Sequence, residues 1–149
     1  MENTLNLEGV SFFHFYIGGQ FIGYPNVKIK EKDEQIKVSM SYGYSLENLE
    51  PEDDMPTLTE EDFRLFLAEV FLLIEGWEPR YVNYDMLDGT QWGMTLSYSD
   101  LDDENNRTED MNDLADTLII SGSNAFPENF DTIYALMAKY GIKNPEFKY

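Results

Sequence analysis

Carboxylates are the residues of this chain with the most chemistry to offer. The 149 residues include 29 Asp and Glu against 10 Lys and Arg, with one histidine and no cysteine. Two carboxylates held across a cleft can hydrolyse glycosides, but among so many acids some pair falls together by chance. No glycine-rich phosphate loop or nucleophile elbow accompanies them. The sequence therefore predicts that the protein is not an enzyme, and a small carboxylate-dependent or divalent-metal-dependent enzyme is the alternative.

The single histidine and one acid-rich stretch are the other candidates for a chemical site. His14 lies within an aromatic, strand-like segment, where a histidine is more often structural than catalytic. The stretch from Asp100 to Asn106 has the oxygen density of a calcium loop. In EF-hand register, however, Asn105 stands where glycine is required and Met111 where glutamate is required. We therefore predict no metal site and no cofactor.

The negative charge is concentrated in two segments that are predicted to be acidic loops. The chain has a net charge of −19, and residues 47–62 and 100–116 each hold eight acids, with Arg107 as the one cation in either segment. Carboxylates held along an edge imitate the phosphates of a duplex and attract a basic nucleic-acid-binding surface by the same electrostatic steering. The residues predicted to face such a partner are Glu50, Glu52, Asp53, Asp54, Asp100, Asp102, Asp103 and Glu104.

The alternative role of this charge is solubility alone, in a housekeeping scaffold. A net charge of about 2 to 8 already keeps a small domain soluble, so −19 exceeds that need. Phosphates of nucleic acids and anionic lipids both repel a surface of this sign. Neither nucleic acid nor a membrane is therefore predicted to bind the chain directly.

The composition predicts one folded domain spanning residues 1–149. Hydrophobic residues make up 42% of the chain and aromatic residues 15%, which is enough for a core and unlike a disordered acidic chain. The absence of cysteine fits a reducing compartment. Residues 1–8 lack the features of a signal peptide, and no apolar run approaches the roughly 20 residues of a membrane span. We expect a cytoplasmic protein whose oligomeric state the sequence leaves open.

The first half of the chain predicts three strands and a helix. The aromatic run 10–17 predicts a strand, and alternation over 27–30 and 36–42 predicts a hairpin turning at 31–34. One hairpin face is apolar. The other face carries Lys28, Lys30, Lys32 and Lys37. Thr59 is a predicted N-cap for a helix over 63–74 that Gly76 ends.

That helix is predicted to be buried on more than one side, because Leu65, Leu72 and Leu73 widen its apolar arc. In the second half, 81–87 and 92–98 flank Asp88-Gly89 and predict another hairpin. A strand over 117–121 and a closing helix follow, with Pro127 at its first position and Gly141 at its end. The order β-β-β-α-β-β-β-α predicts an α+β domain in which two helices cover an antiparallel sheet of about six strands.

Two segments carry a resemblance to known proteins. They are Asp88-Gly89-Thr90-Gln91-Trp92 and the stretch 122–130, which reads Gly-Ser-Asn-Ala-Phe-Pro-Glu-Asn-Phe. Together they resemble a pattern in small bacterial proteins of unassigned function, in which a strand pair and a Gly-Ser-Asn turn lead to a C-terminal helix. The residues themselves predict that Gly89 and Asn124 permit turns and that Trp92 packs with Phe130.

In composition the chain is also similar to toxin-immunity proteins and to phage-encoded inhibitors of restriction or CRISPR nucleases, which are often small, acidic and poor in cysteine. This similarity implies a binding partner and no site residues. Taken with the charge, it predicts a non-catalytic inhibitor of a basic protein, namely a nuclease or another nucleic-acid-binding protein.

Overall fold

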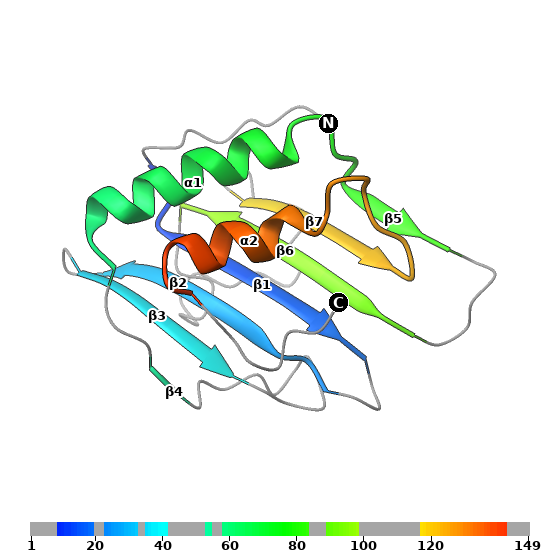
Figure 1. Cartoon of the computed structure of the whole chain (residues 1–149), viewed down its shortest axis with the longest axis horizontal. Helices are drawn as coiled ribbons and strands as arrows, with labels where there is room; N and C mark the ends of the chain where they lie inside the picture. The colour runs from blue at the N-terminus through cyan, green and yellow to red at the C-terminus, as the bar shows by residue number, and fades with distance from the viewer. Residues whose placement is uncertain are drawn as a thin grey trace.

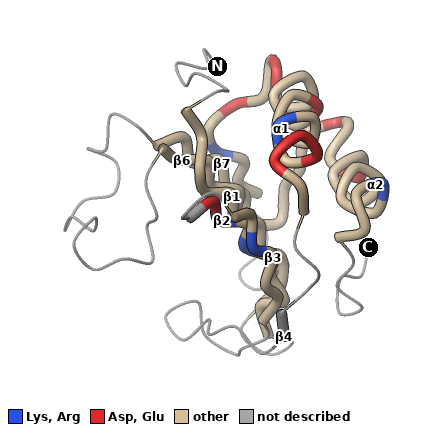
Figure 2. The backbone as a smooth tube through the Cα atoms, turned by 90° about the vertical axis from the view of Figure 1, so that its left-hand side faces the viewer, with Lys and Arg blue, Asp and Glu red and all other residues tan. Residues whose placement is uncertain are grey.

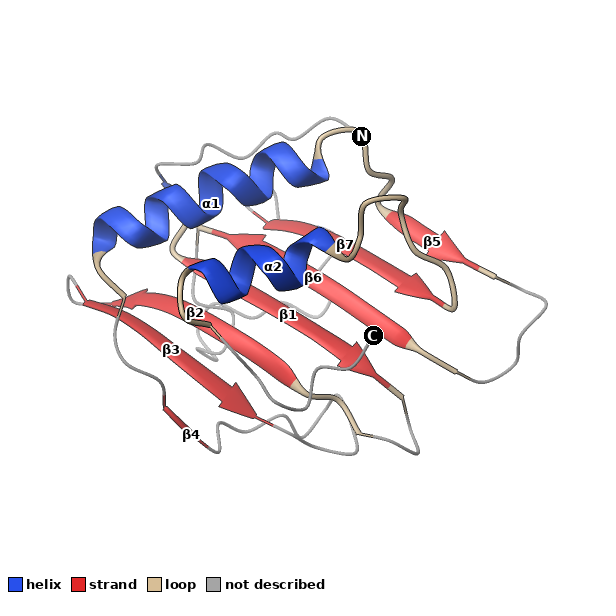
Figure 3. Cartoon of the chain, viewed as in Figure 1, coloured by secondary structure: helices blue, strands red, loops and turns tan. Residues whose placement is uncertain are grey.

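The structure, a computed structural model, describes residues 9–19, 23–32, 35–41, 53–54, 58–83, 89–98 and 117–142. The elements are β1 (Phe12–Gly18), β2 (Asn26–Lys32), β3 (Gln35–Ser41), β4 (Asp53–Asp54), α1 (Glu60–Ile74), β5 (Arg80–Val82), β6 (Gln91–Ser97), β7 (Thr117–Ser123) and α2 (Thr132–Lys139). The strands form one sheet in the order β4-β3-β2-β1-β6-β7-β5, and both helices lie on one of its faces (Figure 1, Figure 3). The predicted α+β class is confirmed.

The predicted hairpin of β2 and β3 is confirmed, with Ile29 opposite Val38 in the ladder. Because side chains alternate along a strand, Ile29 points to the helix side together with its neighbour Phe13 of β1, which packs on Phe66 of α1 at 5.0 Å between ring centroids. Lys28 and Lys30, one residue to either side of Ile29, therefore lie on the opposite face. We call that side of the sheet the lysine face.

The predicted hairpin between 81–87 and 92–98 is wrong. Strand β5 pairs in parallel with β7, with Tyr81 opposite Gly122, and β6 lies between β1 and β7. A turn signal such as Asp88-Gly89 acts only locally. Both edges of β6 are taken by seven-residue strands, so the three-residue β5 adds to the outer edge of β7, where Asn83 N donates to Ser123 O at 3.0 Å.

Helix α1 begins as predicted, because Thr59 Oγ1 accepts a hydrogen bond from Asp62 N at 3.0 Å. It ends at Ile74, just before Gly76. The predicted burial of its wide arc is wrong in part, since Leu65 is 50% exposed and Leu72 is 72% exposed. The sheet and α2 both lie beside α1 (Figure 1), and the high exposure of the two leucines means that neither the sheet nor α2 covers them.

Helix α2 begins later than predicted. Pro127 precedes a run of turns in which Phe130 N donates to Pro127 O at 3.2 Å, and the helix starts at Thr132. The helix end is a Schellman motif: Gly141 N donates to Ala138 O at 3.0 Å and Ile142 N donates to Met137 O at 2.9 Å. Because α2 starts only at Thr132, residues 128–131 form turns in front of the helix.

Candidate functional site

The acidic residues predicted to face a partner are only partly placed. Asp53 and Asp54 form the short edge strand β4, where Asp54 lies opposite Ser39 and Asp53 opposite Met40 of β3. These two positions are thus strand, whereas the sequence predicted a loop. Outside the described residues lie Glu50, Glu52, Asp100, Asp102, Asp103 and Glu104. A joint acidic face built by both segments stays a prediction.

His14 has a structural hydrogen-bond partner on the lysine face. Its Nε2 lies 3.1 Å from Asn26 Oδ1, and Asn26 Nδ2 donates to Ser41 Oγ at 2.6 Å. Because an amide oxygen only accepts, Nε2 of His14 carries the proton in this contact. His14 thus takes part in a hydrogen-bonded chain across β1, β2 and β3, as the structural interpretation of this residue expects.

The two sequence segments that carry the resemblance meet in space. Gln91 lies opposite Ser123 in the ladder of β6 and β7, and Gln91 Nε2 donates to Ser123 Oγ at 2.8 Å. One residue further, Asn124 N donates to Thr90 O and Thr90 N donates to Asn124 Oδ1, each at 2.8 Å. Asn124 has φ 57, which confirms the unusual backbone region predicted for it. Gly89 has the positive φ of 143, but it does not turn the predicted hairpin, because β5 pairs with β7.

Two tryptophans hold the loop that follows. Trp92 Nε1 donates to Ala125 O at 2.9 Å, and Trp77 Nε1 donates to Asn129 Oδ1 at 2.8 Å. The predicted packing of Trp92 with Phe130 is confirmed at 4.7 Å between centroids. A Cβ on Gly122 would overlap Trp92 Nε1, so glycine is what lets the indole approach β7. The loop is anchored at both of its ends by buried indole N–H groups.

This loop closes one side of a hollow of about 370 Å³, which we call the Phe126 hollow. Its apolar walls come from Ile17, Phe126, Pro127, Phe130 and Tyr134. Its polar lining comes from Thr90, Glu128 and Asp131. Phe126 is 44% exposed although it lies 4.9 Å from the buried Phe130, so it forms a rim that is open to solvent.

The sequence reasoning did not single out Glu128 and Asp131. The signal was present in the aromatic residues Phe126, Phe130 and Tyr134, spaced four apart with the two acids between them. Recognising this pattern as a site requires knowing that Trp92, which is far away in the sequence, packs against Phe126 and Phe130. Both acids are exposed, and Asp131 makes no side-chain capping hydrogen bond at the start of α2.

The layer of residues 58–79 and 124–142, which we call the helix layer, is strongly acidic. It contains only Arg64 and Lys139 as cations. The acids of the layer are Glu60, Glu61, Asp62, Glu69, Glu75, Glu78, Glu128 and Asp131. Figure 2 shows these acidic segments in red on α1 and around it.

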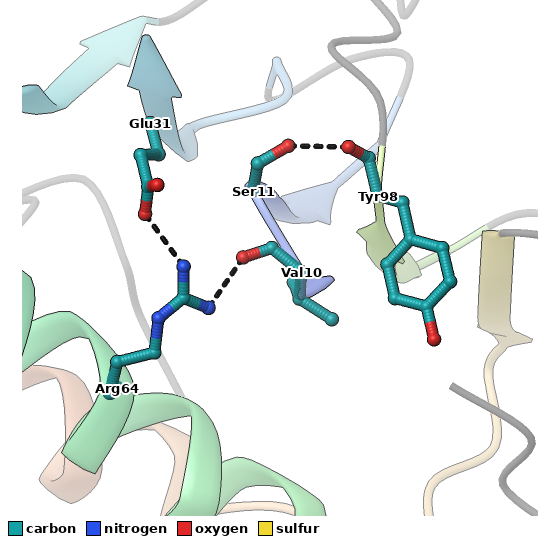
Figure 4. Close-up of polar contacts among 5 residues, drawn as sticks. All are labelled: Val10, Ser11, Glu31, Arg64 and Tyr98. Carbon is teal, nitrogen blue, oxygen red and sulfur yellow. Dashed lines mark hydrogen bonds and ion pairs between the residues drawn. The ribbon is translucent and has the colours of Figure 1, made fainter. Parts of the chain in front are cut away.

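Both cations of the helix layer are held in ion pairs. Arg64 donates through Nη2 to Glu31 Oε2 at 2.6 Å and through Nη1 to Val10 O at 2.7 Å (Figure 4). Lys139 Nζ lies 2.7 Å from Glu69 Oε1, and Tyr140 Oη donates to Glu69 Oε2 at 2.6 Å. The hydrogen bond from Lys139 is the main reason that the pKa of Glu69 lies below its ordinary value, and the hydrogen bond from Tyr140 lowers this pKa further.

Opposite signs thus lie on opposite sides of the described structure. The strands β2 and β3 contain one acid, Glu31, which the ion pair with Arg64 uses. On the lysine face, Lys28, Lys30 and Lys37 are close neighbours in the ladder, with Lys30 directly opposite Lys37. Figure 2 shows blue segments along the sheet strands at β3. As the structure describes them, β2 and β3 therefore hold more lysines than acids.

Within the described residues, no group of three or more His, Cys, Asp or Glu is placed to hold a metal ion. Neither α1 nor α2, the helices that the structure describes, has the length and apolar character needed to cross a membrane. Comparison of the chain with protein-family profiles, curated proteins and solved structures found no match.

Proposed function

We propose that the protein is a non-catalytic, acidic binding protein that inhibits a basic, nucleic-acid-handling protein by covering its cationic surface. One observation carries this proposal: the helix layer is acidic, and both of its described cations are already neutralised by Glu31 and Glu69. Acids that outnumber their local counter-ions in this way create a negative potential that steers a cationic partner towards them.

Exposed apolar side chains on the same layer support a protein partner. Leu65 and Leu72 are exposed side chains two helical turns apart on α1. Glu61 lies about one turn before Leu65, and Glu75 lies about one turn after Leu72. Stable protein interfaces combine a desolvated apolar centre with a polar rim. Solubility alone would not require exposed leucines between acids.

The two predicted acidic segments extend this surface in the proposal. Asp53 and Asp54 lie on the outermost strand of the sheet, next to β3. A strand edge offers unpaired backbone groups, and acids placed there direct it towards basic partners rather than towards other copies of this chain. In this proposal the protein acts in the cytoplasm, which the absence of cysteine supports.

Two biological roles fit the same chemistry. The first is an immunity protein that neutralises a toxin nuclease, and the second is a nucleic-acid mimic that blocks a defence nuclease. A toxin gene beside the coding sequence favours the first role, and a phage or mobile element around it favours the second.

The direct test is affinity capture from the native host and from its phage-infected culture, at low and at high salt. We expect a basic nucleic-acid enzyme to be retained at low salt and released at high salt, because counter-ions screen exposed charges. Retention of no basic protein under either condition would contradict the proposal.

A matched pair of variants then tests the acidic segments. Asp53→Asn with Asp54→Asn removes two charges from a predicted partner-facing segment, and Asp33→Asn with Glu34→Gln removes two charges from the two residues that join β2 and β3 in the sequence. We expect the first variant to slow association with the captured partner by roughly threefold or more and to weaken its salt dependence, and the second to change the rate much less. Equal effects would instead indicate that only the total charge matters, as in a scaffold whose acidity serves solubility.

A further inference from the structure

We propose that the Phe126 hollow binds the guanidinium group of an arginine side chain. That the arginine belongs to a basic partner protein rests on the function proposed above, whereas the binding site itself rests on the hollow. The volume of about 370 Å³ lies in the lower part of the range of about 300–1,000 Å³ typical of small-ligand sites. It suits one long side chain better than a whole cofactor.

The aromatic walls provide the first part of the recognition. Phe126 is partly open to solvent, and Phe130 lies against it at 4.9 Å between centroids and 60° between planes. Two rings at this angle offer one ring face and one adjoining apolar wall. A planar guanidinium stacks on such a face, because the ring quadrupole attracts cations and because guanidinium is only weakly hydrated.

The carboxylates provide the second part. Glu128 and Asp131 both line the hollow, and none of its described lining residues is cationic. A carboxylate accepts two parallel hydrogen bonds from a guanidinium fork, which gives arginine an advantage over the point charge of lysine. The same two acids repel a phosphate or a carboxylate ligand. This repulsion acts against the helix dipole at the start of α2, which would favour an anion there.

The third part is that the loop is already fixed in shape. Trp77 and Trp92 hold Asn129 and Ala125 by hydrogen bonds, and Asn124 is tied to Thr90 in both directions. A site whose walls are ordered before binding loses little conformational entropy when a ligand enters.

The test uses N-acetyl-arginine amide as the probe and N-acetyl-citrulline amide as its neutral, nearly isosteric control. Backbone amide NMR shifts are followed during titration into the intact protein. We expect saturable shifts at Thr90 and within 124–134 with a dissociation constant on the order of 1 mM, as is usual for a ligand of this size. The citrulline probe should bind about tenfold more weakly, because it lacks the charge-assisted hydrogen bonds.

Variants locate the binding. The double change Glu128→Gln with Asp131→Asn keeps side-chain size and a good N-cap, and it should weaken the arginine probe about tenfold. Phe126→Leu, at an exposed position, should weaken it severalfold by removing the ring face. The control Asp33→Asn with Glu34→Gln removes the same charge elsewhere and should leave the affinity within about twofold. Unchanged thermal midpoints establish that each variant is folded.

Equal binding of the citrulline probe, shifts spread over the acidic surface, or an unchanged affinity in the Glu128 and Asp131 double variant would each overturn the arginine site. The probe needs no partner, so its result is independent of affinity capture. Failure of capture with successful probe binding removes the inhibitor function and keeps the site. The reverse pair of results removes the site and keeps the function.

Discussion

The two sides of the sheet carry opposite chemistry although one chain supplies both. On the helix side, the inner surface is apolar and the outer surface is acidic, with Arg64 and Lys139 held in ion pairs. On the lysine face, the same strands present Lys28, Lys30 and Lys37. Strand alternation separates the two chemistries residue by residue, so a net charge of −19 does not describe either surface by itself. A partner chosen by charge must approach a particular side.

Neighbouring residues on β2 give the largest test of this contrast. Ile29 is fully buried beneath the helices, so Ile29→Ala should lower the free energy of unfolding by about 2–5 kcal/mol. Lys30→Ala, one residue along and on the lysine face, should change it by at most about 1 kcal/mol, because Lys30 is only partly buried and lies outside the apolar core. Urea denaturation of both variants measures the difference. Similar losses would mean that the two faces contribute alike to the core.

The contact that joins the two layers gives a smaller effect. Arg64 of α1 bonds both Glu31 of β2 and Val10 O. A double-mutant cycle with Arg64→Met and Glu31→Gln should give a coupling energy of about 1 kcal/mol, since both side chains are largely but not fully buried. Arg64→Met alone should cost more than Glu31→Gln alone, because only the first also loses the bond to Val10. A coupling energy of zero would show that the layers are joined by apolar packing only.

The smallest expected effect depends on pH and stays within the helix layer. The pKa of Glu69 is lowered in the folded protein, chiefly by its hydrogen bond from Lys139, so its contribution to stability is present above its unfolded pKa and is lost as pH falls through the folded value. The pKa of Lys139 is raised, chiefly by its hydrogen bond to Glu69, so its contribution is lost only as pH rises through that raised value.

The thermal midpoint of the wild type should therefore exceed that of Glu69→Gln at neutral pH, and the difference should shrink as pH falls through the lowered pKa of Glu69 in the folded protein. The variant Glu75→Gln removes one charge from the C-terminal cap of the same helix and serves as the control for general charge effects. A constant offset between wild type and Glu69→Gln down to strong acid would show that the ion pair does not act through ionisation.

Local signals made much of the fold predictable. The cap at Thr59, the stop before Gly76 and the alternation along β2 and β3 each depend on residues a few positions apart, and each is confirmed. The pairing of β5 with β7 was not predictable, because it depends on which sheet edge is left unoccupied once β6 has paired on both sides. The exposure of Leu72 likewise depends on how many layers cover α1.

The candidate site divides in the same way. The turn residues Gly89 and Asn124 and the contact of Trp92 with Phe130 follow from residue type and spacing. The hollow does not, because its lining comes from β1, the residue before β6, the loop 126–131 and α2, and the sequence does not say that they converge. The partner-facing role of the two acidic segments stays a prediction, since only Asp53 and Asp54 among the named residues have described positions.

The indole pair beneath the loop also makes the molecule its own optical reporter. Trp77 and Trp92 are the two tryptophans of the chain, and their rings lie 6.0 Å apart next to Phe130. All indole emission of the unlabelled protein therefore originates from this single corner. Changes in ultraviolet fluorescence would register events at the loop while remaining nearly blind to the distant lysines, which allows the two sides to be observed separately without attaching a dye.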